Sequence, residues 1–453
     1  MSRRHVLLAG LFAVVTAPPA SASSQSVEAR AAATPAGAGR RDTAVTSKFD
    51  VDGLPVILRR NTANEVIAAN LYFLGGARQL TPANAGIEAL LLLASERGTR
   101  RFPGASARQR TANLGSTISI EANDDWSAIG LHAIRATFDS TWAILADRVM
   151  APTLSPPEVE IARAQMIADA RQRTTQPDDA AEELADSLLY QGNPYAIDVT
   201  GTPASLSAIT IPQLRAYHDQ QFVTSRMLLV VVGNVDRAEV ERLVRGTIAT
   251  LPRGTYTWTP PPAPAATGRA LAVDNRSIPT NYVLGYVPGP AATNPDYTAL
   301  RVATAVLSGR LYTEVRSRRN LSYAVEAQFI DRAYGVGGLY VTTVDPNAVL
   351  RIMRHELSTL QNEQVDPEGL RRLEQQFITE YYLKNETNAD QANVLARAEV
   401  FGGDFRAADR FMQDLEKVTP EDVRRVARRY LKDFRFAYVG DASKLDRSLA
   451  SEF

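Results

Sequence analysis

The chain has 453 residues, which exceeds what a single hydrophobic core usually serves and predicts two large domains. Apolar residues make up 45% and charged residues 22%, with 50 basic and 50 acidic side chains, as in a soluble globular protein. This balance excludes the basic footprint that nucleic-acid binding needs, and the absence of cysteine excludes disulfides and thiol catalysis.

The first 22 residues have the pattern of an export signal. Arg3 and Arg4 precede the apolar stretch Val6–Ala17, and Ala20–Ala22 forms a small-residue cleavage site. Paired arginines fit either the twin-arginine route or the ordinary secretory route. We therefore expect cleavage after Ala22 and a periplasmic or secreted mature protein. No later apolar run is long enough to span a bilayer, so we expect no membrane attachment after cleavage.

Two segments of low apolar content punctuate the rest of the chain. Residues 23–47 are rich in Ala, Gly, Arg and Thr, which predicts a flexible leader. Residues 251–268 carry five prolines, which favour an extended linker over a helix or a central strand. The linker separates two parts of similar size, residues 48–250 and residues 269–453.

These two parts resemble each other. Residues 209–234 contain an amphipathic helix and then a buried strand that reaches Gly233, and residues 418–441 repeat this order up to Gly440, 207 residues later. A second echo pairs the segment beginning at Asn70 with the one beginning 211 residues later. The similar offsets predict a duplicated domain of about 200 residues.

Strands and helices are grouped in each part and do not alternate regularly. Residues 128–133 and 339–344 have the alternation of strands, whereas residues 157–173, 178–190 and 367–383 have helical patterns. This grouping predicts an α+β protein with two homologous domains, each a mostly antiparallel sheet with helices packed on it.

One helical segment carries a resemblance to a known family. Gly86 opens the run Ile-Glu-Ala-Leu-Leu-Leu-Leu-Ala-Ser-Glu-Arg, which ends at Gly98-Thr99. The arrangement resembles the active-site helix of the pitrilysin/insulinase peptidases, in which an HxxEH motif binds zinc between the same landmarks. The resemblance extends from about residue 49 to residue 439 and implies that the chain forms half of a clamshell.

In this alignment the zinc motif is missing. The two histidines fall at Ala89 and Leu93 and the general base falls at Leu92, while the family's third ligand, a glutamate on a later helix, falls at Asp169. A catalytic zinc site needs three protein ligands, so one carboxylate cannot hold the metal. The resemblance therefore implies a member that is not catalytic alone and has no cofactor of its own.

No other residues supply the missing ligands. The histidines of the chain are His5, His132, His218 and His355. No two of them lie at helical metal-ligand spacing, and the first would leave with the signal, so we interpret the others as structural. Glu88 and Glu96 flank the lost motif, and we interpret them as solvated helix charges.

The second half keeps a different part of the family pattern. Residues 307–323 resemble the family's C-terminal-domain signature, in which an arginine and a tyrosine seven residues apart hold the substrate backbone. Arg316 and Tyr323 match this pair, and guanidinium and phenol are both donors to a peptide carbonyl. Arg310, in the same turn, is either a further substrate contact or a surface charge.

Together these features predict a peptide-binding subunit that pairs with an HxxEH-bearing catalytic subunit of similar size. Arg316 and Tyr323 would hold the peptide carbonyl in trans while the partner's zinc activates water, and extended peptides would add a strand to a sheet edge. Three alternatives stay open: an active peptidase with unusual metal ligands, a scaffold subunit that binds no peptide, and an unrelated transport or chaperone function.

Overall fold

The computed structural model describes residues 45–265 and 267–453. The predicted signal peptide and the predicted leader up to residue 44 lie outside the described residues. Residues 45–47, assigned above to the leader, instead begin strand β1 (Val45–Val51), which pairs antiparallel with β2 (Leu54–Arg60). The ordered domain therefore starts earlier than predicted, because Val45 and the next residues pair with the end of β2.

The N-terminal domain is built on a six-stranded sheet of order β1-β2-β6-β3-β5-β4. Only β2 and β6 (Met227–Gly233) run parallel. The other strands are β3 (Val66–Leu74), β4 (Thr117–Ala122) and β5 (Trp126–Ile134). The α-helices of the domain are α1 (Ile87–Ser95), α2 (Ser106–Asn113), α3 (Phe138–Met150), α4 (Pro156–Thr175), α5 (Pro177–Leu189), α6 (Pro203–Ala208), α7 (Ile211–Gln221) and α8 (Arg237–Arg245).

The C-terminal domain has a five-stranded sheet of order β7-β11-β8-β10-β9. Only β7 (Ala270–Asn275) and β11 (Arg435–Gly440) run parallel. The other strands are β8 (Asn281–Ala291), β9 (Val325–Ile330) and β10 (Tyr334–Thr343). Its α-helices are α9 (Asp296–Leu311), α10 (Pro346–Asn362), α11 (Pro367–Lys384), α12 (Asn388–Gly402), α13 (Ala407–Leu415), α14 (Pro420–Tyr430) and α15 (Arg447–Ala450). Among the described helices, none has the length and apolar character to cross a membrane.

The two sheets share one topology, which confirms the predicted pair of similar α+β domains. Strands β2, β6, β3, β5 and β4 correspond to β7, β11, β8, β10 and β9, and the single parallel pair lies at the same place in both. Helices α7 and α14 precede the matching strands β6 and β11, and each begins with a threonine capping box, at Thr210 and Thr419.

The second predicted correspondence, which aligns Asn70 with Asn281, is out of register. Val232 pairs with Ala68, whereas Val439, its counterpart 207 residues later, pairs with Tyr282, which lies 214 residues beyond Ala68. An offset of 211 therefore misaligns the strands by three residues. Because an odd slip turns each side chain to the opposite face of a sheet, the two asparagines are not equivalent.

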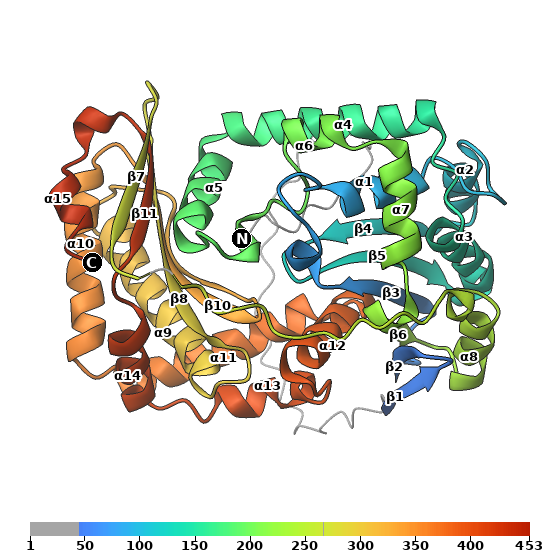
Figure 1. The fold of residues 1–453 in the computed structure, drawn as a ribbon. Helices are drawn as coiled ribbons and strands as arrows, with labels where there is room; N and C mark the ends of the chain where they lie inside the picture. The colour runs from blue at the N-terminus through green and yellow to red at the C-terminus, as the bar shows by residue number, and fades with distance from the viewer. Residues whose placement is uncertain (1–44, 266) are drawn as a thin grey trace, which may run out of the picture.

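Each domain also contributes a helix to the sheet of the other. Helix α5 packs on β8 and β11, and α12 packs on β3 and β6, so the two helices cross the domain boundary in opposite directions (Figure 1). On α12, Leu395 belongs to one buried cluster with Ile57 and Val230, and Phe401 lies 5.4 Å from Trp126 between ring centroids. The domains are thus joined through their cores.

A buried ion pair joins two hairpin turns at the same boundary. Arg332, between β9 and β10, lies 3.0 Å from Asp124, between β4 and β5, and 3.5 Å from Asp186 on α5. It also donates a hydrogen bond of 2.6 Å to Tyr190. Because charges this deeply buried require their partners, the contact fixes the β9–β10 hairpin against the N-terminal domain.

The proline-rich linker lies along the N-terminal domain. Its described residues between 251 and 268 form neither helix nor strand. The backbone N–H of Thr224 donates to the carbonyl of Pro252 at 3.0 Å, and the Asn193 side chain donates to the carbonyl of Pro262 at 2.9 Å. The linker is therefore an extended segment that is hydrogen-bonded to the N-terminal domain.

The crossed packing of α12 predicts a large loss of stability when its apolar face is truncated. Leu395→Ala is expected to lower the free energy of unfolding by about 3 kcal/mol, because Leu395 is fully buried between the domains. Leu383→Ala removes the same atoms from a side chain that is 66% exposed and should change stability little. Urea titration measures both, and equal effects would contradict the crossed packing.

Candidate functional site

The residues of helix α1 that align with the HxxEH motif are part of the hydrophobic core. Ala89, Leu92 and Leu93 are 2%, 1% and 5% exposed and belong to the apolar core of the N-terminal domain. Gly86 begins the helix at φ 86°, and a Cβ there would lie 2.8 Å from the backbone of Gly201. The glycine landmark is thus required by close packing, independently of any metal.

The place where α1 packs against α4 is called the α1 corner here, and its side chains do not fit a zinc ion. Asp169 is half-buried on α4, which packs against α1, and is the only aligned side chain with donor atoms. Ala89, Leu92 and Leu93 offer no lone pairs, whereas a catalytic zinc ion takes three protein ligands. Across residues 45–265 and 267–453, no group of three or more His, Asp and Glu side chains is placed to hold a metal ion.

Glu88 is not a solvated charge, contrary to the prediction. It is 3% exposed and accepts hydrogen bonds from Arg226 at 2.6 Å and from the hydroxyl of Tyr217 at 2.9 Å. Burial and the nearby Glu88 carboxylate raise the pKa of Tyr217 well above its ordinary value. Glu96 is half-buried, 3.8 Å from Arg148. The sequence could not reveal the buried pair, because Arg226 lies in a distant segment.

The histidines do not form a site. Burial lowers the pKa of His132 on β5, and a ring nitrogen of His218 lies 2.8 Å from the carbonyl oxygen of Val149. His355 is exposed on α10. The fourth histidine, His5, lies outside the described residues.

Arg316 and Tyr323 come together on the surface of the C-terminal domain. Helix α9 continues into a π-helical turn, Tyr312–Ser317, a conformation often found at functional sites. The Arg316 guanidinium donates to the carbonyl of Tyr323 at 3.3 Å and lies 5.0 Å and 5.8 Å from the rings of Tyr312 and Tyr323. Tyr323 is 79% exposed. A guanidinium and a phenol, both hydrogen-bond donors, are therefore presented side by side.

Arg310 does not join this pair. It is half-buried and lines a neighbouring open cavity of about 610 Å³ between α9, α10 and α11, together with Glu356 and Arg372. The structure thus groups two of the three predicted substrate contacts and places the third elsewhere.

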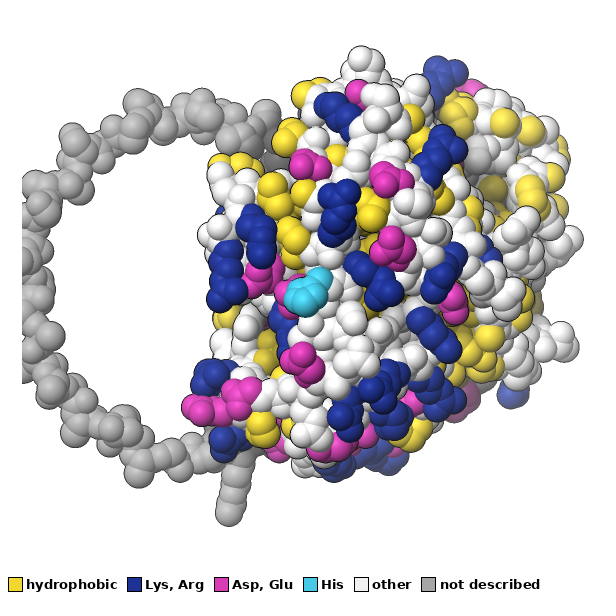
Figure 2. Space-filling view, turned by 90° about the vertical axis from the view of Figure 1, so that its left-hand side faces the viewer, with side chains coloured by type: hydrophobic (Ala, Val, Ile, Leu, Met, Phe, Trp, Pro, Cys, Tyr) yellow, Lys and Arg dark blue, Asp and Glu magenta, His cyan; other side chains and the backbone are white. Residues whose placement is uncertain are grey.

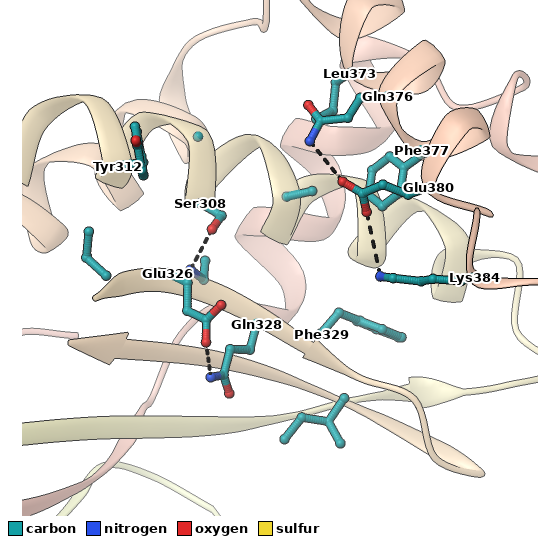
Figure 3. A pocket seen from close by; sticks show the side chains of 15 residues that line it. Ser308, Tyr312, Glu326, Gln328, Phe329, Leu373, Gln376, Phe377, Glu380 and Lys384 are labelled. Carbon is teal, nitrogen blue, oxygen red and sulfur yellow. Dashed lines mark hydrogen bonds and ion pairs between the residues drawn. The ribbon is translucent and has the colours of Figure 1, made fainter. Parts of the chain in front are cut away.

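A groove of about 590 Å³ adjoins the pair and was not predicted (Figure 3). It lies between α9, strand β9 and α11, and its lining includes Ser308, Tyr312, Phe329, Phe377 and Glu380. Tyr312 both lines the groove and stacks on the guanidinium, so groove and pair are continuous. Because β9 is an edge strand, the groove follows the open side of a sheet.

This groove is the counterpart, in the C-terminal domain, of the α1 corner. Helix α9 follows β8 as α1 follows β3, β9 and β4 are matching edge strands, and α11 and α4 are each the second long helix after the hairpin. Ala305, Ser308 and Gly309 line the groove at the i, i+3, i+4 spacing that HxxEH would have on α1. Small residues keep this corner open, whereas aliphatic side chains fill the other.

The outer face of the C-terminal domain carries mixed charge. Lys and Arg side chains lie among Asp and Glu side chains over this face (Figure 2). On α14, Arg425 lies 2.5 Å from Asp296 and 2.8 Å from Asp422, and Arg429 lies 3.3 Å from Asp296. Arg425 and Arg429 of this helix are thus engaged by acidic neighbours.

Helix α1 lies in the core at the place of the family's zinc-binding helix, and none of the residues aligned with HxxEH carries a metal-ligating atom. In a chain with two domains of one topology, this defines a metallopeptidase-like protein. Residues 55–203 match the family model described as Insulinase (Peptidase family M16), and residues 208–377 match the Peptidase M16 inactive domain. The chain belongs to this insulinase family.

Relatives of known sequence or structure agree. The chain is 23% identical over 369 residues to an uncharacterized zinc protease of Streptomyces coelicolor, covering 78% of this chain and 80% of the relative. It is 22% identical over 405 residues to the mitochondrial-processing peptidase subunit beta of Blastocladiella emersonii, covering 86% of each. The solved peptidase M16 inactive domain from Pseudomonas fluorescens shares the fold, with a TM-score of 0.80, 19% identity and coverage of 88% and 98%.

The buried pair beside α1 yields a stability prediction. Glu88→Gln is expected to lower the free energy of unfolding by about 3 kcal/mol at neutral pH, because it leaves the Arg226 charge buried without a counter-charge. Glu160→Gln is the matched control, since Glu160 is 63% exposed in its pair with Arg163. Chemical denaturation compares them, and a Glu88→Gln protein as stable as wild type would show that the pair is not buried.

Proposed function

We propose that this chain is a non-catalytic, peptide-binding subunit of an exported zinc-peptidase complex. Its partner is an HxxEH-bearing subunit of similar size, whose zinc activates the attacking water. Arg316 and Tyr323 bind the carbonyl of the substrate in trans, and the chain itself carries no cofactor. The export signal predicted over residues 1–22 supports assembly in the periplasm or outside the cell.

The observation that carries the proposal is the exposed arginine–tyrosine pair. Arg316 is held between two tyrosine rings, and Tyr323 is 79% exposed, so both side chains are displayed at the surface. In the α1 corner of the same chain, Asp169 is the one aligned residue with metal-ligating atoms, too few for a catalytic zinc site. Donors suited to a polarised carbonyl would therefore act together with a metal held by another subunit.

The groove supports the peptide-binding part. The backbone N–H of Ala327 points away from β10, since it donates to Ser308 on α9. Backbone groups alternate in direction along a strand, so those of Val325 and Phe329 face the groove as well. Such an edge suits an extended peptide, which would gain main-chain hydrogen bonds with little sequence preference.

Pairing with a second subunit is supported by the relatives. The mitochondrial-processing peptidase relative is named as a subunit, and the match covers most of both chains. A division of labour, with zinc in one chain and binding surface in the other, is consistent with a chain that keeps the fold and lacks the metal ligands.

The proposal predicts that Arg316→Ala impairs a partner that carries the zinc. The purified chain is mixed with an exported HxxEH-bearing protein of similar size from the same organism, and cleavage of a fluorogenic peptide is measured. Loss of a charged donor should lower kcat/KM by about 10- to 100-fold. Arg318→Ala is the control, because Arg318 is 68% exposed and pairs only with Glu314 nearby.

Other outcomes would favour the alternatives. Unchanged turnover with Arg316→Ala would indicate a scaffold subunit, and hydrolysis by the chain alone would indicate an active peptidase. Peptide binding without any HxxEH partner would indicate a transport or chaperone function.

A further inference from the structure

The open edge of β9 is already occupied at its centre. The hydroxyl of Ser308, on α9, accepts a hydrogen bond from the backbone N–H of Ala327 at 3.2 Å (Figure 3). Ala327 is the third of the six residues of β9, and it is 8% exposed. The N–H that an added strand would need most is therefore bonded to a side chain of the protein itself.

This bond has a clear role in the free protein. A backbone N–H left without a partner in a partly buried groove is unfavourable, and an open strand edge invites unwanted pairing. The serine hydroxyl satisfies the donor at Ala327 and protects the edge. Because the groove is lined by β9 from Val325 to Ile330, the backbone groups of Val325 and Phe329 border it on either side of Ala327.

The bond can also be released without moving the backbone. Ser308 lies in the last turns of α9, where a serine hydroxyl can donate a hydrogen bond to the carbonyl four residues earlier, that of Thr304. Rotation about the Cα–Cβ bond of Ser308 would move its oxygen, which accepts from Ala327, away from that N–H, and the O–H would then donate to the helix carbonyl. The N–H of Ala327 would then be free for the carbonyl of a bound peptide.

We propose that Ser308 is a reversible cap on β9 that competes with bound peptide and thereby sets the affinity of the groove. The inference rests on the proposed peptide-binding function and assigns to Ser308 a positioning role in it. An extended peptide pairs with the two ends of β9 and displaces the serine hydroxyl from the centre. Binding in the wild-type chain is weakened by the hydrogen bond that has to be broken.

The test compares Ser308→Ala with wild type in the full chain. The probe is a fluorescein-labelled peptide of alternating valine and threonine, flanked by lysines, whose composition favours an extended backbone. Fluorescence anisotropy should show about fivefold tighter binding to Ser308→Ala, because no internal hydrogen bond is lost. Hydrogen exchange at the Ala327 amide should be faster in this variant without peptide. Ser358→Ala, on α10 outside the groove, is the matched control.

Two further variants separate the cap from a general effect of the substitution. Ser308→Thr keeps the hydroxyl and should bind peptide as wild type does. Ala327→Pro removes the N–H at an edge position, so Ser308→Ala should then add nothing. Equal or weaker peptide binding by Ser308→Ala, or unchanged exchange at Ala327, would overturn the cap alone. Absence of peptide binding by every variant would overturn the peptide-binding function together with it.

Discussion

The crossed packing of two helices is the constraint on which the rest of the structure depends. Helix α5 covers the sheet of the C-terminal domain, and α12 covers the sheet of the N-terminal domain. Each sheet is therefore covered in part by a helix from the other domain. The ion pair between Arg332 and Asp124 adds a buried polar contact at the same boundary. Because Arg332 stands at the tip of the β9–β10 hairpin, this boundary also fixes the edge strand that borders the groove.

The two similar domains have corresponding corners, and the side chains that line these corners differ. In the N-terminal domain, aliphatic residues on α1 fill the corner and join the core. In the C-terminal domain, Ala305 and Gly309 leave room, and the space becomes a groove beside the Arg316 stack. Histidines placed at Ala89 and Leu93 would have to bury imidazole rings within packed aliphatic neighbours, which is unfavourable without a metal or hydrogen-bond partners. One corner is thus an open groove, and the other is filled by the core.

Local patterns predicted the fold well, because hydrophobic periodicity and caps are local. The helix–strand order before Gly233 and Gly440, the α+β class and the mostly antiparallel sheets all follow from such patterns. The predicted equivalence of Asn70 and Asn281 was wrong, because a few identical residues do not determine the register of a strand. Pairings between distant segments were inaccessible in the same way: Glu88 finds Arg226 only in the folded chain, and an amphipathic helix such as α12 does not specify which sheet it covers.

The candidate site was predicted in part. Arg316 and Tyr323 were identified from a motif, and the structure brings them together, whereas Arg310 lines the neighbouring cavity and does not contact them. The groove was missed because it is created by the absence of side-chain volume on α9. Small residues four positions apart, at Ala305 and Gly309, were the one available signal.

The central claim is that the chain lacks a metal site and acts through another subunit. Its most direct test is the zinc content of the purified chain after incubation with excess zinc and gel filtration, measured by inductively coupled plasma mass spectrometry. The account predicts no retained zinc and no peptide hydrolysis by the chain alone. One zinc ion retained per chain, with unaided hydrolysis, would contradict it.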